Sequence, residues 1–175
     1  ILPIGTDGNK TIPSVLFFPE NERRHYVGDP AILKYVDGGM RGRLMQSIKS
    51  FLPDSSFTST VIRGFGVNTL EDLISLVLSD IKMKADKITG EDVREVVLGR
   101  PALFSDNKEK DKIAEDRLRT AAGKAGFEVV HFQKEPVAAA FHYVTLITNP
   151  ELTLVVDLGG GTSDFTLVKI HPKKS

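Results

Sequence analysis

Eight residues near the C-terminal end combine a turn made only of glycine with a carboxylate on each side: Asp157-Leu158-Gly159-Gly160-Gly161-Thr162-Ser163-Asp164. Because the three glycines lack Cβ atoms, the turn can adopt left-handed conformations and bring its backbone N–H groups close to an anion. The hydroxyl of Thr162 adds a further donor. Donors that converge without an intervening side chain are what a phosphate group needs. The sequence therefore predicts a phosphate-binding turn at Gly159, Gly160, Gly161 and Thr162.

The two aspartates beside this turn indicate that a cation accompanies the phosphate. A carboxylate next to a phosphate is repelled unless a positive charge offsets the two negative ones. Magnesium keeps several waters and needs few protein ligands, so one carboxylate acting through water is sufficient. We expect Asp164 to join the same binding site. The simpler alternative is an ordinary hairpin turn, but such turns use two-residue connections and require neither the flanking aspartates nor Thr162.

Two apolar segments within residues 152–170 predict the strands that carry the turn. Upstream, apolar periodicity and Gly or Pro residues predict strands at 13–18, 26–28, 93–98 and 127–132, and helices at 29–36, 41–52, 69–87, 111–125 and 136–146. Residues 54–68 are predicted to form a loop or a short strand. From residue 93 onward, the order strand, helix, strand, helix, strand, strand predicts an α/β sheet with helices on its faces and parallel strand connections.

The clearest helix is predicted to begin after Thr69, because Asp72 three residues later completes a capping box. Its apolar residues recur at helical spacing and predict one buried stripe: Leu70, Leu73, Ile74, Val77, Leu78 and Ile81. In the helix at 111–125, the residues expected to face inward are Ile113, Leu118, Ala121, Ala122 and Ala125.

The composition excludes several classes of function. The 175 residues are 41% hydrophobic and 26% charged, which is ordinary for a globular domain. The 23 basic and 23 acidic residues balance, so we expect no nucleic-acid partner. No apolar run is long enough to span a bilayer, and we expect no membrane partner. The absence of cysteine excludes disulfides and thiolate metal sites and favours a cytoplasmic location. The four histidines lack metal-ligand spacing and are expected to be structural or solvated.

Several short motifs resemble, in the same order, the nucleotide-binding domain of DnaK-type heat-shock chaperones, the heat shock protein 70 class. The glycine turn is similar to the second phosphate loop of the actin-like ATPase superfamily, and Glu135-Pro136-Val137-Ala138-Ala139-Ala140 resembles a helix start of these chaperones. The other matching motifs are Thr11-Ile12-Pro13-Ser14, Val27-Gly28-Asp29-Pro30-Ala31 and Ala125-Gly126-Phe127-Glu128-Val129. Three further motifs are most similar to the YegD-like branch: Phe17-Phe18-Pro19, Lys49-Ser50-Phe51-Leu52 and Gly99-Arg100-Pro101.

The resemblance implies roles for individual residues. The glycine turn would hold the β- and γ-phosphates of ATP or the phosphates of ADP, with Mg²⁺ bridging them. Asp157 would act near the cation and the attacking water, Glu135 would orient that water, and Lys49 would contact the γ-phosphate. Pro101 would couple the nucleotide state to a partner domain. The simpler alternatives are a helix N-cap for Glu135, a solvated lysine on an amphipathic helix for Lys49 and a loop proline for Pro101.

The resemblance also implies the fold class and the domain organisation. We expect an α/β fold, namely an actin-like ATPase (ribonuclease H-like) lobe with an inserted small subdomain, truncated at both ends. Residues 1–92 would form the first strand and the inserted subdomain, 93–150 the rest of lobe I, and 151–175 the phosphate-binding hairpin of lobe II. The family's first phosphate hairpin carries an Asp-x-Gly-Thr turn, and the nearest string here, at residues 37–40, is predicted to be a helix C-cap.

A parent with both hairpins would be an ATPase, whereas these 175 residues are expected to bind nucleotide weakly or not at all and to be inactive alone. Unfolded protein clients or co-chaperones would be its partners. An empty strand position would invite the hairpin to fill it, within the chain or by exchange in a dimer. In that hypothesis, residues 154–157 run parallel to 95–98, and residues 165–170 run antiparallel to 14–18.

Two other classes of protein remain as alternatives. One is an actin-like filament protein of the rod-shape or plasmid-segregation type, which shares the glycine hairpin. The stretch from Val27 to Leu52 and the long helix at 69–87 favour the chaperones over this class. The other is a sugar or acetate kinase of the same superfamily. It would need a substrate-binding acid from an inserted domain, and the sequence offers no candidate for it.

Overall fold

A computed structural model describes residues 3–159 and 163–172 of the chain. Its elements, in chain order, are η1 (Thr6–Gly8), β1 (Val15–Pro19), β2 (Tyr26–Val27), α1 (Asp29–Asp37), β3 (Gly42–Gln46), η2 (Ile48–Phe51), β4 (Ser59–Ile62), β5 (Gly66–Thr69), α2 (Leu70–Thr89), β6 (Glu95–Arg100), α3 (Lys108–Lys124), β7 (Val129–Lys134), α4 (Glu135–Tyr143), η3 (Val144–Leu146), β8 (Glu151–Leu158) and β9 (Ser163–Ile170).

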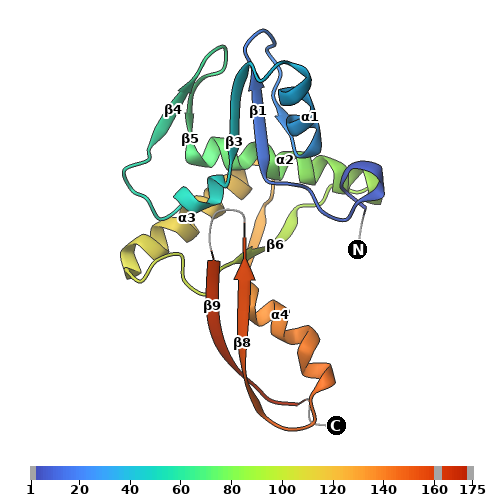
Figure 1. Cartoon of the computed structure of the whole chain (residues 1–175), viewed down its shortest axis with the longest axis vertical. Helices are drawn as coiled ribbons and strands as arrows, with labels where there is room; N and C mark the ends of the chain where they lie inside the picture. The colour runs from blue at the N-terminus through green and yellow to red at the C-terminus, as the bar shows by residue number, and fades with distance from the viewer. Residues whose placement is uncertain (1–2, 160–162, 173–175) are drawn as a thin grey trace.

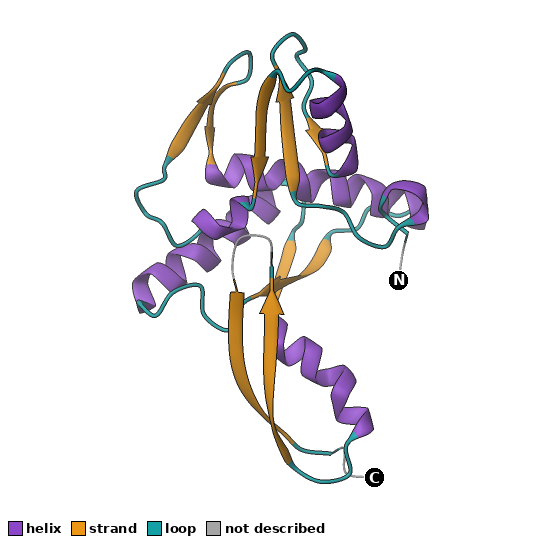
Figure 2. Ribbon diagram, viewed as in Figure 1, coloured by secondary structure: helices purple, strands orange, loops and turns teal. Residues whose placement is uncertain are grey.

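The molecule is elongated, and the parallel pair β6–β7 joins its two ends (Figure 1). One end contains the sheet β2-β1-β3, the hairpin β4–β5 and the helices α1, α2 and α3. The other end consists of the hairpin β8–β9 with α4 alongside it, as the colouring by secondary structure also shows (Figure 2). The described residues therefore form a mixed α/β structure, as expected.

The strand β1 is buried at every position because both faces of its sheet are covered. Leu16 and Phe18 pack into the main core with α2, whereas Val15 and Phe17 pack with Ala31 of α1. β1 pairs antiparallel with β2 on one side and with β3 on the other. The predicted strand at residues 26–28 is confirmed as β2, Tyr26–Val27.

The predicted helix at residues 41–52 is wrong. Residues 42–46 form β3, which pairs with β1 from Val15↔Gln46 to Pro19↔Gly42, and a short 3-10 helix follows. Leu44 packs with the cluster beneath α1, and its neighbour Met45 packs against the main core. This alternation has a period of two residues, so pairing with β1 outweighed the helical spacing of the apolar residues.

The helices α2 and α3 cover the main core, and the predicted capping box of α2 is confirmed. Thr69 accepts a hydrogen bond from the amide of Asp72 at 3.1 Å, and the amide of Thr69 donates to the Asp72 carboxylate at 2.8 Å. Leu70 and Leu73 are fully buried. The prediction that Ile113 faces inward is wrong, because Ile113 is 37% exposed. The stripe of α3 begins one residue later, at Ala114, and continues through Leu118, Ala121 and Ala122.

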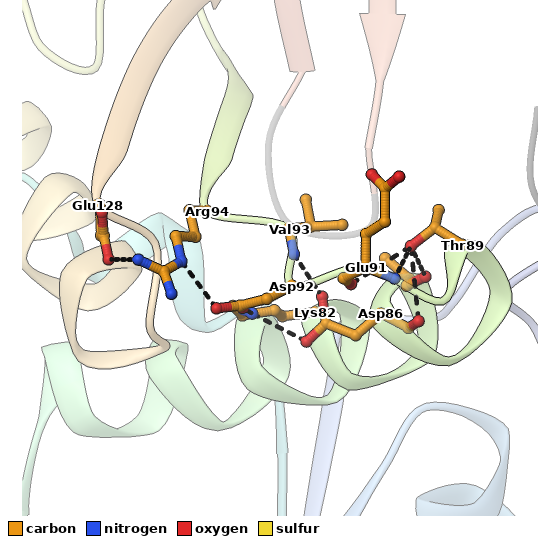
Figure 3. A network of polar contacts seen from close by, with 9 residues as sticks. Lys82, Asp86, Thr89, Glu91, Asp92, Val93, Arg94 and Glu128 are labelled. Carbon is orange, nitrogen blue, oxygen red and sulfur yellow. Dashed lines mark hydrogen bonds and ion pairs between the residues drawn. The ribbon is translucent and has the colours of Figure 1, made fainter.

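A network of polar contacts joins the end of α2 to the start of β6 and to the turn before β7 (Figure 3). The ammonium of Lys82 contacts Asp86 at 2.8 Å and Asp92 at 2.5 Å. Asp86 also accepts a hydrogen bond from the amide of Val93, and Arg94 links Asp92 to Glu128. These contacts fix where β6 begins relative to α2.

β6 and β7 pair in parallel from Glu95↔Val129 to Arg100↔Lys134, which confirms the predicted parallel connection through α3. α4 begins directly after β7, at Glu135, and one face of β8–β9 packs against it. Ala140, Ile147 and Ile170 form the small core between the helix and the hairpin.

The hypothesis that β8–β9 fills an empty strand position within the same chain is wrong. In the described residues, β8 pairs only with β9, from Glu151↔Ile170 to Leu158↔Ser163. β6 pairs with β7, and β1 pairs with β2 and β3. The hairpin instead stays with α4, which directly follows β7 and buries Ile170. Exchange of the hairpin between two chains remains a prediction.

Candidate functional site

An open cleft with a volume of about 440 Å³ lies where η2, the end of β6, the start of α4 and the turn end of the hairpin meet. Its lining residues come from five separate parts of the chain: Ser14, Ser47, Lys49, Ser50, Pro53, Pro101, Leu103, Phe104, Glu135, Asp157, Gly159 and Asp164. The lining therefore includes every described residue that the sequence predicted to bind or act on a nucleotide. Gly160, Gly161 and Thr162 lie outside the described residues.

Lys49 and Glu135 are brought together although 86 residues separate them in the sequence. The ammonium of Lys49 donates to Oε1 of Glu135 at 2.7 Å and to the carbonyl oxygen of Gly99 at 3.1 Å. Lys49 lies in the short helix η2 and not on a long amphipathic helix, which removes the simpler alternative for this residue. The ion pair joins the inserted subdomain to the first turn of α4.

Glu135 is the first residue of α4 and does not cap it. The N-cap position belongs to Lys134, and its side chain makes no capping hydrogen bond. A carboxylate in the first turn interacts favourably with the helix dipole. Because Glu135 is free of a capping role, its carboxylate reaches Lys49 at the cleft.

Gly99 allows this arrangement, and sequence reasoning had assigned it no role in the site. A Cβ atom at this position would lie 3.0 Å from Oε1 and 3.1 Å from Cγ of Glu135. Glycine inside a strand often marks such a close approach. Its position directly after the predicted apolar strand at 93–98 was the available signal.

Asp157 and Asp164 are direct partners across the β8–β9 ladder. They share the alternating face of the hairpin that also carries Ile170, which packs on α4. Both aspartates line the cleft, and both also line a smaller cavity of about 210 Å³ next to Glu135. Neither forms an ion pair with a described residue. Like charges directly opposite each other on a strand pair are unfavourable, so this pair suits a bound cation.

The donor set at the cleft fits magnesium. The described residues offer no group of three or more His, Cys, Asp or Glu side chains able to hold a metal ion. Asp157 and Asp164 supply only carboxylate oxygens, and they would hold a metal ion of this type together with water. Oxygen ligands with several retained waters are typical of Mg²⁺.

A buried arginine supports one wall of the cleft, and sequence reasoning missed its role. The guanidinium of Arg100 pairs with Asp111 at 2.7 Å and with Glu115, two acids four residues apart on α3. Burial opposes ionisation of Asp111, but hydrogen bonds from the amide of Phe104 and from Arg100 outweigh it and lower the pKa of Asp111. The available signal for this ion-pair network was a basic residue at a strand end, followed by two acids at helical i, i+4 spacing.

Known proteins resemble this chain over most of its length. A family model described as "Hsp70 protein" matches residues 4–173. Chaperone protein DnaK of Halobacterium salinarum is 30% identical over 162 residues, which cover 93% of this chain and 24% of that protein. Chaperone protein DnaK of Elusimicrobium minutum is 32% identical over 164 residues, which cover 93% of this chain and 25% of that protein.

The match over nearly the whole chain means that this chain belongs to the Hsp70 family. The predicted relation to DnaK-type chaperones and the predicted actin-like ATPase fold class are confirmed. The chain spans about a quarter of the length of the curated relatives it matches. The filament-protein and kinase alternatives gain no support from these matches. No helix in the described part of the chain is both long enough and apolar enough to cross a bilayer.

Proposed function

We propose that this chain forms part of the nucleotide-binding domain of a DnaK-like chaperone, and that the full-length protein binds and hydrolyses ATP with Mg²⁺. One observation carries the proposal: the Lys49–Glu135 pair lies in the same cleft as Asp157, Gly159 and Asp164. Three segments distant in sequence therefore present to one volume a cation, a helix-terminal carboxylate and the two aspartates with Gly159.

Each residue of the cleft has a distinct part in this proposal. The amides of the glycine turn bind phosphate oxygens, and Lys49 neutralises charge on the terminal phosphate. Bound magnesium would neutralise further phosphate charge when held at Asp157 through water, with Asp164 nearby. Glu135 accepts a hydrogen bond from the attacking water and orients it. Positioning and charge neutralisation of this kind provide most of the catalysis in phosphoryl transfer.

The geometry of Lys49 leaves room for the ligand. An ammonium group has three donors, and the contacts to Glu135 and Gly99 use two of them. The side chain of Lys49 is 44% exposed, so the third donor can reach a phosphate oxygen in the cleft. A phosphate bound there would complete the coordination of the ammonium without breaking the ion pair to Glu135.

Other parts of the proposal rest on family resemblance and composition. The 175 residues alone would bind nucleotide weakly and would not hydrolyse it. Unfolded protein clients, co-chaperones and a cytoplasmic location belong to the same proposal, and the lack of cysteine agrees with that location. The division into residues 1–92, 93–150 and 151–175 and the YegD-like branch are also part of it.

Isothermal titration of the full-length protein with ATP in the presence of MgCl₂ tests the proposal. We expect saturable binding by the wild type and at least tenfold weaker binding by Lys49→Ala. Lys87→Ala, an exposed lysine in the last turn of α2, is the matched control and should bind like the wild type. A folded full-length protein that binds no ATP would refute the proposed function.

A further inference from the structure

The loop of residues 101–107, between β6 and α3, forms one wall of the cleft. Pro101, Leu103 and Phe104 of this loop line it. The loop belongs to no strand or helix, and contacts with side chains hold it in place. The amide of Phe104 donates to Oδ1 of Asp111 at 2.7 Å. The shape of this wall therefore depends on whatever fixes Asp111.

Arg100 fixes Asp111 and contacts the loop directly. Its side chain is only 10% exposed. One guanidinium nitrogen donates to the same Oδ1 of Asp111 that accepts from Phe104, and another donates to Glu115 one turn further along α3. The guanidinium also lies 5.0 Å from the ring centroid of Phe104, and its Nε donates to the carbonyl oxygen of Pro101.

These contacts depend on the shape of arginine. A planar guanidinium can bond two carboxylates at fixed angles and stack on an aromatic ring at the same time, whereas a lysine ammonium cannot. Arg100 also lies in sequence between Gly99, whose carbonyl oxygen accepts a hydrogen bond from Lys49, and Pro101 of the loop. A shift of the backbone at Arg100 would therefore move two parts of the cleft at once.

We propose that Arg100 is a positioning residue for nucleotide binding, acting through Asp111 to hold the loop 101–107 as a rigid wall of the cleft. This inference rests on the proposed function, because the wall matters for catalysis only if the cleft binds a nucleotide. The part that concerns the loop itself stands on the contacts alone. Arg100 contacts no ligand in this scheme; it sets the place of Pro101, Leu103 and Phe104.

A second arginine provides a matched control. Arg119 pairs with the same Glu115 at 3.6 Å, and its guanidinium lies 4.7 Å from the ring centroid of Phe132. It also donates to the carbonyl oxygen of Val130. Arg119 is 49% exposed and does not line the cleft. The two arginines thus share the type of contact but differ in the segment that they hold.

The test compares Arg100→Met with Arg119→Met in the full-length protein. Methionine keeps an extended apolar side chain and removes the guanidinium. Hydrogen exchange measured by mass spectrometry reports on the loop. We expect exchange in peptides covering residues 101–107 to be at least tenfold faster in Arg100→Met and unchanged in Arg119→Met. Steady-state kinetics should show about a tenfold higher KM for ATP in Arg100→Met, with kcat changed less than twofold.

Arg100→Lys is the second variant, for the case that Arg100→Met does not fold. Lysine keeps the buried positive charge but lacks the planar guanidinium. We expect it to loosen the loop as well, by a smaller factor. Wild-type exchange rates in the loop of a folded Arg100 variant would overturn the proposal. So would a loosened loop with an unchanged KM for ATP. If the wild type binds no ATP, the proposed function fails, and the exchange rates still decide whether Arg100 holds the loop.

Discussion

The two ends of the molecule differ in how much of their apolar surface is covered. In the core between α2 and α3, Leu70 and Leu73 are fully buried. The β8–β9 hairpin leaves one complete face open, with exposed fractions from 46% to 72% for Leu152, Leu154, Val156, Leu158, Phe165 and Leu167. Its other face packs on α4 through a small cluster around Ile170.

The buried residues of the main core therefore differ from the residues that line the candidate site. The main core cluster brings together buried residues of β1, α2 and α3, and neither Asp157 nor Asp164 belongs to it. Asp157 and Asp164 lie on the hairpin, where the strand ladder and one short helix provide the support. Regions with few buried contacts open most easily, and ligand-binding segments are often drawn from them. We therefore expect substitutions in the core to act on the packing of α2 and α3, and ligands at the cleft to act on the segments that line it.

The largest expected effect comes from a cavity in the core. Leu73→Ala should lower the free energy of unfolding by about 3 kcal/mol, because Leu73 is fully buried and its neighbours can only partly close the gap. Leu154→Ala on the open face of the hairpin is the matched substitution and should cost less than about 1 kcal/mol. Urea unfolding followed by circular dichroism measures both. Equal losses of unfolding free energy for the two variants would contradict the proposed difference between the core and the hairpin.

A bound nucleotide should act on the segments that line the cleft. At a concentration of about 100 times its dissociation constant, MgATP should stabilise the full-length protein by about 2.7 kcal/mol. Hydrogen exchange should slow most in β8–β9 and in the loop 101–107, and least in α2. Lys49→Ala with the same ligand is the control and should show a much weaker response. Protection as large in α2 as in β8–β9 and the loop 101–107 would argue against binding at the cleft.

The ion pair between α2 and α3 predicts a pH dependence of the core. Hydrogen bonds from Lys124 and from the amide of Thr69 lower the pKa of Asp72 from 3.8 to about 2. Because the folded pKa is the lower one, this contribution is present above about pH 4 and is lost as the pH falls towards 2. The side chain is 37% exposed, so solvent screening limits the contribution to roughly 1 kcal/mol.

Asp72→Asn should therefore lower the unfolding free energy at pH 7 and make little difference at pH 2, when both are measured by urea unfolding. Asp116→Asn, an exposed position on α3, is the control and should leave the stability at pH 7 nearly unchanged. An Asp72→Asn variant whose stability matches the wild type at pH 7 would show that the ion pair and the capping box contribute nothing measurable.

The smallest expected effect concerns the open face of the hairpin. Leu152→Thr should change the free energy of unfolding by less than about 0.5 kcal/mol, because Leu152 is 70% exposed and threonine suits a strand. Val168→Thr, on the face that packs against α4, is the matched control and should cost more. A loss above about 1 kcal/mol for Leu152→Thr that grows with protein concentration would indicate that a second chain covers this face.

Local patterns in the sequence predicted the parts of the fold that depend on neighbouring residues. The capping box at Thr69 and Asp72 forms within three residues, and the stop of α1 at Gly38 forms within five. The two strands of the hairpin, β8 and β9, are neighbours in the sequence as well. β3 could not be predicted in the same way, because its residues fit a helical spacing until pairing with β1 imposes a period of two. The hairpin hypothesis failed because it required pairing partners more than fifty residues away.

The sequence by itself determined the residue types of the site: a glycine turn between two aspartates, a glutamate at a helix start and a lysine in a short motif. Only the tertiary structure decided that Lys49 meets Glu135 across 86 residues and that Gly99 makes room for the glutamate side chain. It also decided that Arg100 is buried against α3, where it holds the cleft wall. Short-range hydrogen bonds and spacing are encoded in neighbouring residues, whereas contacts between distant segments depend on the packing of the whole chain.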